Sequence, residues 1–311
     1  MQFENKFKKL HFYQKIYSKN KELTSKNEVK IPKIIHFIWL GPNRFPFESI
    51  ENLKSWKRKH PDWTIKFWTD KHPPPIEGMQ IQTVDATYLP HLFEEYNALT
   101  NVGEKSLLLR YEILYKEGGL YVDHDAKCHQ AFDRFHHSYD FYAAVVPQSQ
   151  NFTFTQNCLL GPHIFGSKKR HPVFAALFSC IKQQQSTQWN HLWLNFTEGI
   201  TAGLKSDKEN KNIIFPAFYF YANSMLSKNE IKNSKDRALR YASHYFNHYW
   251  FVDRIEGIKE LISYKYKETR DKILKRTHTL NLFLHMNLCM LFANACLFFY
   301  QRYWKRRHEC A

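Results

Sequence analysis

Two aspartates separated by one residue, Asp123 and Asp125, are the side chains of this 311-residue chain best placed to do chemistry. They directly follow an apolar run at 120–122, which predicts a short buried strand. Two carboxylates at a strand end repel each other unless a positive charge offsets the repulsion. A divalent cation does this, and hard oxygen ligands suit Mg²⁺ or Mn²⁺. Because alternate side chains of a strand point the same way, we expect both carboxylates to face one metal or one metal-bound diphosphate.

A helix and a glycine pair precede this strand. Apolar residues at 107, 108, 111, 114 and 115 predict a helix over 104–117 with one buried face. Gly118-Gly119 is predicted to end it, since glycine accepts a left-handed C-cap without a Cβ penalty. Arg110 lies on this helix, where its planar guanidinium can serve a hydroxyl or phosphate oxygen. The alternatives are a helix-surface ion pair of Arg110 with Glu104 or Glu117, and a surface turn or ion pair for the two aspartates.

The N-terminal half predicts an α/β fold. The run at 31–41 is β-branched and aromatic and indicates a buried central strand, followed by a helix at 47–60 and a second strand at 62–70. This order is that of a parallel sheet with a right-handed crossover. We further expect strands at 80–84, 141–146 and 158–165, helices at 88–100 and 171–181, and closing segments at 213–221 and 239–250.

These motifs together resemble glycosyltransferase family 32, which includes Golgi α-1,6-mannosyltransferases and inositol-phosphoceramide mannosyltransferases, and they are similar to the catalytic domains of glucosylating toxins. The residues that carry the resemblance are IPKIIHFIWLG at 31–41, Ser55-Trp56, Trp68-Thr69-Asp70 and the stretch 104–126. The resemblance implies a Rossmann-like nucleotide-diphospho-sugar transferase fold (GT-A type), with a mostly parallel sheet flanked by helices and helical additions at both ends. It implies a metal-dependent, retaining transfer of a hexose from a UDP- or GDP-linked sugar to a hydroxyl acceptor.

The resemblance also assigns roles to individual residues. Asp125 is expected to bind the metal directly, with His244 as a third protein ligand, while Asp123 contacts ribose or sugar hydroxyls or reaches the metal through water. Arg110 would contact the donor sugar. The remaining assignments concern the nucleotide sugar: Trp39 stacks on the base beside the backbone of Leu40, Tyr121 braces the sugar, Asn157 contacts it, and Trp250 covers the diphosphate. Trp39, Tyr121 and His36 also fit a purely structural role in the core.

Two departures from the family pattern define an alternative function. The relatives place an aspartate three residues before the arginine, where this chain has Leu107, and a serine where it has Tyr249. The first removes a carboxylate that binds sugar hydroxyls in the relatives, and the second weakens the assignment of the metal ligands that the resemblance implies. The alternative is therefore a catalytically impaired relative that binds sugar nucleotides or serves as a scaffold.

The net charge of +16 leaves three partner classes open: nucleic acid, an anionic membrane surface or phosphorylated small molecules. The sequence contains no zinc-finger spacing, RNP-like motif or dense arginine-rich arm, so nucleic acid is not an expected partner. Six cysteines without C-x-x-C pairs favour free thiols in a reducing compartment. The N-terminus lacks the apolar region of a signal peptide, and a cytoplasmic location is expected.

Three segments are predicted. Residues 1–29 form a basic helical segment, either amphipathic for a membrane or packed on the domain; 30–255 form the catalytic domain; and 256–311 form a helical extension. The apolar run 279–300 with its basic flank favours a peripheral membrane segment, although a buried helical hairpin is the alternative.

Overall fold

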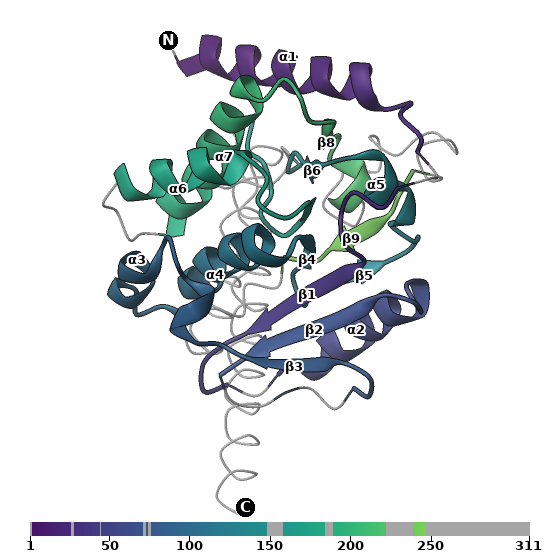
Figure 1. Ribbon diagram of the computed structural model, residues 1–311, viewed down its shortest axis with the longest axis vertical. Helices are drawn as coiled ribbons and strands as arrows, with labels where there is room; N and C mark the ends of the chain where they lie inside the picture. Colours follow the sequence, from purple (N-terminus) through teal and green to yellow (C-terminus); the bar gives the residue numbers. More distant parts are fainter. Residues whose placement is uncertain are drawn as a thin grey trace, which may run out of the picture. The chain divides into compact units, whose positions relative to one another are not determined.

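The computed structural model describes residues 2–25, 28–43, 45–70, 73, 76–147, 158–183, 189–221 and 239–246 (Figure 1). The predictions for Asn157, Tyr249, Trp250 and the segment 256–311 lie outside these residues. None of the helices that the structure describes combines the length and the apolar character needed to cross a bilayer.

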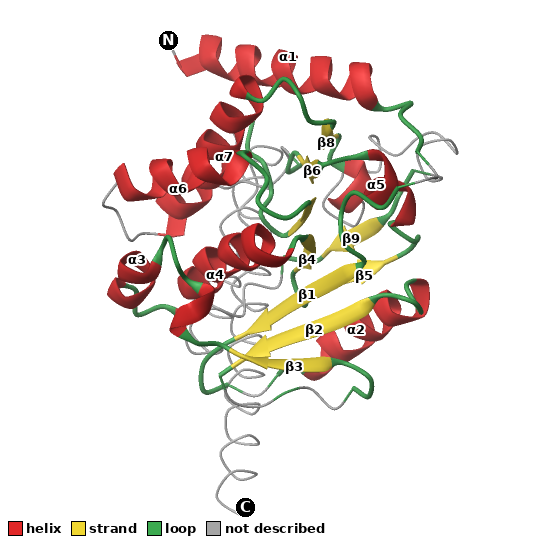
Figure 2. Cartoon of the chain, in the orientation of Figure 1, coloured by secondary structure: helices red, strands yellow, loops and turns green. Residues whose placement is uncertain are grey.

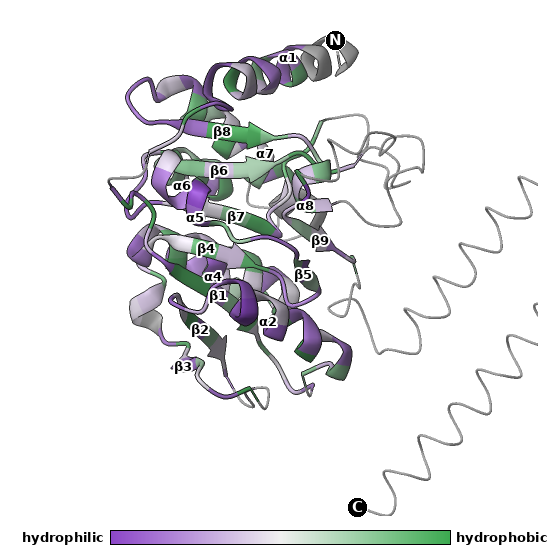
Figure 3. Ribbon diagram, turned by 90° about the vertical axis from the view of Figure 1, so that its right-hand side faces the viewer, coloured by the Kyte–Doolittle hydropathy of each residue, from purple (hydrophilic) through white to green (hydrophobic). Residues whose placement is uncertain are grey.

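A seven-stranded mixed sheet forms the centre of the fold, in the strand order β3-β2-β1-β4-β7-β6-β8. Its pairings are parallel except for the two made by β7, so the predicted α/β class with a mostly parallel sheet is confirmed. The strands are β1 (Ile34–Trp39), β2 (Thr64–Thr69), β3 (Gln80–Thr83), β4 (Gly119–Val122), β6 (Phe141–Ala144), β7 (Ile164–Ser167) and β8 (Asn212–Phe215). Figure 3 shows hydrophobic colour along β1, β7 and β8, as expected for strands covered on both faces.

A second, two-stranded sheet pairs β5 (Ala126–Cys128) with β9 (Ala242–His244) in antiparallel register. Helices surround the two sheets (Figure 2). They are α1 (Gln2–Asn20), α2 (Phe47–Lys59), the 3₁₀ turn η1 (Ala86–Tyr88), α3 (Phe93–Ala98), α4 (Val102–Glu117), α5 (Asp133–Ser138), α6 (Val173–Gln183), α7 (Trp189–Ser206) and α8 (Phe218–Tyr221).

Several predicted elements differ from those observed. The segment 88–100 contains only a 3₁₀ turn and the short α3, and the strand predicted at 158–165 begins later, as β7. Helix α7 was not predicted, although Trp193, Phe196, Ile200 and Leu204 repeat at helical spacing and are all buried. The remaining predicted strands and helices occur close to their expected bounds.

Helix α4 is buried on all sides and does not present the single apolar face predicted. Every residue from Ser106 to Leu114 is buried, because α4 packs on β1, β4 and β7 and against α7. Asn101 caps its N-terminus by accepting hydrogen bonds from the amides of Gly103 and Glu104. A helix buried on all sides carries Arg110 into the interior, close to the end of β4.

The glycine pair after α4 lets β4 approach β1 closely. Gly118 caps the helix with φ 66°, and ψ −166° places it outside the left-handed helical region that the sequence predicted. Gly119 follows with φ 104°, and a Cβ there would lie 2.7 Å from the carbonyl oxygen of Ile34 in β1. The pair therefore permits the close approach of β4 to β1, in which Leu120 pairs with Ile35 and Tyr121 with His36.

The basic N-terminal helix packs on the body of the protein, which is one of its two predicted roles. Tyr13 is 2% exposed, and its hydroxyl lies 2.6 Å from the Thr201 hydroxyl on α7. At the end of α1, the side-chain amide of Asn20 donates to the backbone oxygen of Asn212 at 2.7 Å. Helix α1 thus covers the edge strand β8.

Candidate active site

The two aspartates lie in a turn between β4 and β5 and not within a strand. The amide of Ala126 donates to the carbonyl oxygen of Asp123 at 3.1 Å, which closes the turn. The prediction that strand alternation points both carboxylates the same way is therefore wrong in its geometry. The turn nevertheless brings both carboxylates to the same imidazole, that of His244.

His244 joins the site through the pairing of β5 with β9, in which it lies opposite Ala126. Its Nε2 lies 3.3 Å from Oδ2 of Asp123 and 3.0 Å from Oδ1 of Asp125. Burial by itself lowers the pKa of His244, but the charge of Asp125 and hydrogen bonds to both aspartates outweigh it and raise the pKa to about 9. At neutral pH the imidazolium therefore offsets the repulsion between the two carboxylates.

Asp123 is held from its other side by the helix that precedes its strand. Its Oδ1 lies 3.1 Å from Nη1 of Arg110 and accepts a hydrogen bond of 2.6 Å from the Tyr121 hydroxyl. Burial raises the pKa of Asp123, but Arg110, together with His244, outweighs this and lowers the pKa to about 2. Asp123 is therefore ionised, with Oδ1 fully engaged and Oδ2 directed at His244.

Arg110 is 1% exposed and is fixed by several partners at once. Its guanidinium donates to the carbonyl oxygens of Ser106 and Pro162 at 3.1 and 2.8 Å and to the Ser106 hydroxyl at 3.0 Å. It also stacks over the Tyr121 ring at 4.2 Å. Arg110 forms its ion pair with Asp123 and not with Glu104 or Glu117, the two partners considered from the sequence. Glu117 pairs with Lys66 instead.

The residues predicted to hold the base lie at the carboxyl end of β1. Trp39 and Leu40 are buried, and the Trp39 indole donates to the carbonyl oxygen of Asn43 at 2.8 Å. The indole meets the His124 ring edge-on at 4.9 Å, so the base position and the acidic turn adjoin. The amide of Gly41 donates to the Asp70 carboxylate at 2.9 Å, which joins the ends of β1 and β2. Base stacking by Trp39 stays a prediction.

His36 lies deeper, within β1, and is structural. Its Nε2 lies 2.9 Å from the carbonyl oxygen of Gly118, to which it donates, and its Nδ1 accepts from the Trp68 indole at 3.1 Å. Burial lowers the pKa of His36 to about 4, so the ring is neutral near pH 7.

His163 is a residue of the site that the sequence did not point to. It precedes β7, its carbonyl oxygen accepts from the amide of Asp123 at 2.8 Å, and its ring lies 4.3 Å from the His244 ring. Asp123, His163 and His244 can each offer one ligand atom within 4.8 Å of the others. No local pattern marks His163, because the pairing of β4 with β7 is what brings it here.

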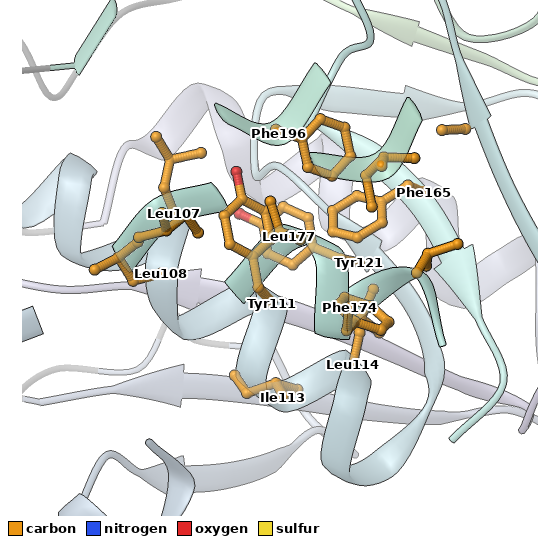
Figure 4. Close-up of a cluster of buried hydrophobic side chains, with 14 of the residues drawn as sticks. Leu107, Leu108, Tyr111, Ile113, Leu114, Tyr121, Phe165, Phe174, Leu177 and Phe196 are labelled. Carbon is orange, nitrogen blue, oxygen red and sulfur yellow. The ribbon is translucent and has the colours of Figure 1, made fainter. Parts of the chain in front are cut away.

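Leu107, where the family pattern has an aspartate, is fully buried in the main hydrophobic core (Figure 4). Figure 4 shows it beside Leu108 and near Tyr111, which stacks on Phe196 at 5.4 Å. The side chain at 107 thus contributes to packing.

Comparison with known proteins relates the acidic turn to a family of glycosyltransferase regions. Residues 46–142 match the family described as glycosyltransferase sugar-binding region containing DXD motif. The match ends within β6 and includes the acidic turn, with Asp123-His124-Asp125 as its D-x-D motif.

Two curated proteins of different kinds are similar to part of the chain. Inositol phosphoceramide mannosyltransferase 3 of Schizosaccharomyces pombe is 26% identical over 203 residues, covering 58% of this chain and 54% of that protein. Subversion of eukaryotic traffic protein A of Legionella pneumophila is 26% identical over 228 residues, covering 67% of this chain and 33% of that protein. The chain thus spans about half or less of the length of these relatives.

Solved structures of glycosyltransferases are also similar. The PaToxG glycosyltransferase has a TM-score of 0.44 at 18% identity, over 66% of this chain and 79% of that chain. The galactosyltransferase LgtC, solved with donor and acceptor sugar analogues, has a TM-score of 0.41 at 13% identity, over 71% and 90%. The present chain shares with the expected fold its mostly parallel central sheet flanked by helices.

Proposed function

We propose that the protein is a retaining glycosyltransferase that moves a hexose from a UDP- or GDP-linked donor to a hydroxyl acceptor, with Mn²⁺ or Mg²⁺ at the acidic turn. The observation that carries the proposal is the convergence of Asp123 and Asp125 on His244 at the carboxyl end of β4. From β1 the chain builds β2 and β3 on one side and then places β4 on the other. Ligands of open α/β sheets bind outside the carboxyl ends of strands at such a switch point.

The residues at the turn fit a divalent cation. Two carboxylates and an imidazole are oxygen and nitrogen donors that first-row divalent metals accept. Nε2 of His244 lies within 3.3 Å of one oxygen of each carboxylate, and a cation would satisfy the same three groups. When bound, the metal would act as a Lewis acid on the leaving diphosphate.

The chain's own residues would divide the remaining work. Asp125 and His244 hold the cation, and Asp123 offers Oδ2 to it or to donor hydroxyls. Arg110 already serves Asp123, Ser106 and Pro162, so we assign it the role of positioning the Asp123 carboxylate. Trp39 would hold the base, and the resemblance to retaining enzymes favours attack from the front face of the sugar.

A surface depression of about 280 Å³ beside the turn is our candidate for the acceptor. Two of its residues reach the turn: the Tyr245 amide donates to the Asp125 carbonyl oxygen at 3.1 Å, and the Asn52 side chain to that of His124 at 3.4 Å. An aromatic ring with amide and carboxylate groups suits a hydroxylated acceptor. Its lining residues are Glu48, Glu51, Asn52, Arg58, Lys127 and Tyr245. The inositol phosphoceramide mannosyltransferase relatives make a glycolipid one acceptor to test.

Leu107 favours the second candidate, a sugar-nucleotide-binding protein with little turnover. Its burial in the core means that this position supplies no carboxylate to a donor sugar. The two functions differ in turnover and not in binding. Hydrolysis of the donor, measured together with nucleotide binding, therefore separates them.

The test is hydrolysis of a panel of UDP- and GDP-sugars with Mn²⁺ or Mg²⁺, combined with nucleotide binding. We expect one donor to be hydrolysed, and Asp125→Asn to lower the rate by about 100-fold or more, since electrostatic stabilisation of a leaving group is worth several kcal/mol. Asp62→Asn, at an exposed position, is the control and should retain the rate. Binding without hydrolysis would favour the second candidate, and unchanged rates in Asp123→Asn and Asp125→Asn would place the site elsewhere.

A peripheral membrane location of a cytoplasmic protein is a further proposal from the sequence alone, for the apolar run 279–300 and its basic flank. The full chain should pellet with anionic vesicles, and deletion of 279–311 should abolish this. Equal pelleting of both proteins would contradict the proposal.

A further inference from the structure

His163 reaches the acidic turn from a part of the chain outside the D-x-D motif and its family match. It precedes β7, the antiparallel neighbour of β4, and is 6% exposed. Its carbonyl oxygen accepts from the Asp123 amide at 2.8 Å, so its backbone is tied to the turn. Its ring lies 4.3 Å from that of His244, with an interplanar angle of 39°.

The ligand atoms of three side chains lie close enough together for a shared cation site to form by side-chain rotation. The ligand atoms of Asp123, His163 and His244 lie within 4.8 Å of one another. Neighbouring ligands of one first-row ion are about 3–3.5 Å apart, and ligands on opposite sides about 4 Å, given metal–nitrogen and metal–oxygen bonds of about 2.0–2.2 Å. Side-chain rotations that move the three atoms inward would bring them to one ion.

Tyr221, on α8, holds His163 in an orientation suited to a metal ligand. Its hydroxyl lies 3.2 Å from Nδ1 of His163. A metal-binding histidine characteristically donates its other ring N–H to such a partner, which fixes the tautomer. With Nδ1–H donating to the tyrosine oxygen, Nε2 carries the lone pair that a cation needs.

The surrounding residues keep this arrangement in place. A Cβ on Gly161 would lie 1.8 Å from the Tyr221 hydroxyl, so only glycine leaves room for that oxygen. The rings of Trp193 and Phe246 meet the His163 ring edge-on at 5.1 and 5.2 Å. The imidazole is thus packed against two aromatic rings, which helps to fix its orientation as a defined site requires.

We propose that His163 is a further protein ligand of the metal at the acidic turn and that Tyr221 is its positioning residue. The inference rests on the metal binding in the proposed function and adds a second imidazole to it. Mg²⁺ is bound through oxygen atoms and keeps several waters, so a second imidazole contributes little to its binding. Mn²⁺ and Co²⁺ are first-row metals of the series that bind mixed nitrogen and oxygen sites, with Co²⁺ the tighter of the two. The protein is therefore expected to select Mn²⁺ or Co²⁺ over Mg²⁺.

The test measures dissociation constants of Mn²⁺ and Mg²⁺ by calorimetry on the full chain, with UDP or GDP present. His163→Gln should weaken Mn²⁺ binding by more than tenfold while changing Mg²⁺ binding little, and Tyr221→Phe should weaken Mn²⁺ binding by about tenfold or more. Co²⁺ spectra give a second readout, because loss of a nitrogen ligand shifts the visible bands.

The matched control is His171→Gln, since His171 is also buried and its Nε2 lies 3.5 Å from an aspartate, Asp207. Its Mn²⁺ affinity should equal that of the wild type.

The outcomes separate this inference from the proposed function. If Asp125→Asn abolishes Mn²⁺ binding while folded His163→Gln binds it like the wild type, the proposed function stands and His163 is not a ligand. If His163→Gln does not fold, unchanged Mn²⁺ affinity and Co²⁺ spectra in Tyr221→Phe overturn the inference. If the wild type binds neither metal, the inference and the metal part of the proposed function both fail.

Discussion

At the scale of single residues, the site depends on a buried carboxylate with a positive group on each side. Asp123 lies between Arg110 and His244, which contact different oxygens of its carboxylate. This arrangement keeps the carboxylate ionised in spite of its burial. Removing Arg110 or His244 leaves the buried charge of Asp123 partly uncompensated, so the stability of the protein is sensitive to substitution of either residue.

Arg110→Met is therefore expected to lower the free energy of unfolding by about 3–5 kcal/mol, as for other broken buried pairs. Urea denaturation measures the loss. Adding Asp123→Asn should restore part of it, because the uncompensated charge is then gone. Lys54→Met breaks an exposed ion pair with Glu51 and serves as the control, with little expected effect. A loss in Arg110→Met as small as that of the control would contradict this account of the pair.

His36 gives the molecule a pH dependence away from the site. Its pKa is lowered to about 4 by burial, whereas an unfolded histidine has a pKa of about 6.5. Between these values the unfolded chain binds the proton and the folded chain does not. Stability is therefore complete above about pH 6.5 and falls as the pH drops towards 4. His136, with its pKa lowered to about 3 by burial, acts in the same direction.

The predicted contribution of His36 is a slope of about 1.4 kcal/mol per pH unit within this window. Unfolding free energies from pH 7 to 4.5 should show a shallower slope in His36→Gln than in the wild type. Substitution of the exposed His11 by glutamine should leave the slope unchanged. Identical slopes in the wild type and His36→Gln would show that His36 is not protonated on unfolding.

At the scale of elements, α1 is an integral part of the domain. Tyr13→Ala should lower the free energy of unfolding by about 3–5 kcal/mol, the usual cost of removing a buried aromatic ring. Tyr13→Phe removes only the hydrogen bond to Thr201 and should cost about 1 kcal/mol. Gln14→Ala, at an exposed position of the same helix, is the control. If Tyr13→Ala is as stable as Gln14→Ala in thermal and urea unfolding, α1 does not pack as described.

The elements that the sequence predicted are those with a continuous local pattern. The strand β1 and the helix α2 follow from runs of apolar or periodic residues, and the glycine pair marks the end of α4. The positions of β7 and of the β5–β9 pair follow from contacts between distant segments, which local patterns do not encode. Helix α7 is different: we did not predict it, although the helical spacing of its apolar residues is a local pattern that indicates a helix.

The same distinction between local patterns and long-range contacts explains which residues of the candidate site could be predicted. Asp123 and Asp125 were found from their spacing at a strand end, although they lie in a turn. His244 was placed with them by family resemblance, and its contact with both carboxylates requires the β5–β9 pairing. His163 had neither signal, because only the antiparallel β7 brings it to the turn.

At the scale of the whole molecule, the described residues build a seven-stranded sheet whose chain order reverses beside β1, and a second sheet of β5 and β9. This reversal aligns the ends of β1 and β4, so that a base at Trp39 and a diphosphate at Asp125 can belong to one ligand. The buried helix α4 packs beneath this arrangement, and Leu107 contributes packing there in place of a carboxylate. We therefore propose the carboxyl ends of β1 and β4 as the donor site, and the donor panel identifies its sugar.

The central claim is that Asp123, Asp125 and His244 hold a cation against the diphosphate of a nucleotide. The most direct measurement is a crystal structure with Mn²⁺ and UDP or GDP, with diffraction data collected at the manganese absorption edge. The account predicts an anomalous peak bonded to Asp125 and His244, with the diphosphate beside it and the base near Trp39. Manganese and nucleotide bound at a different place, or an intact His244–carboxylate contact with both ligands absent at saturating concentrations, would contradict it.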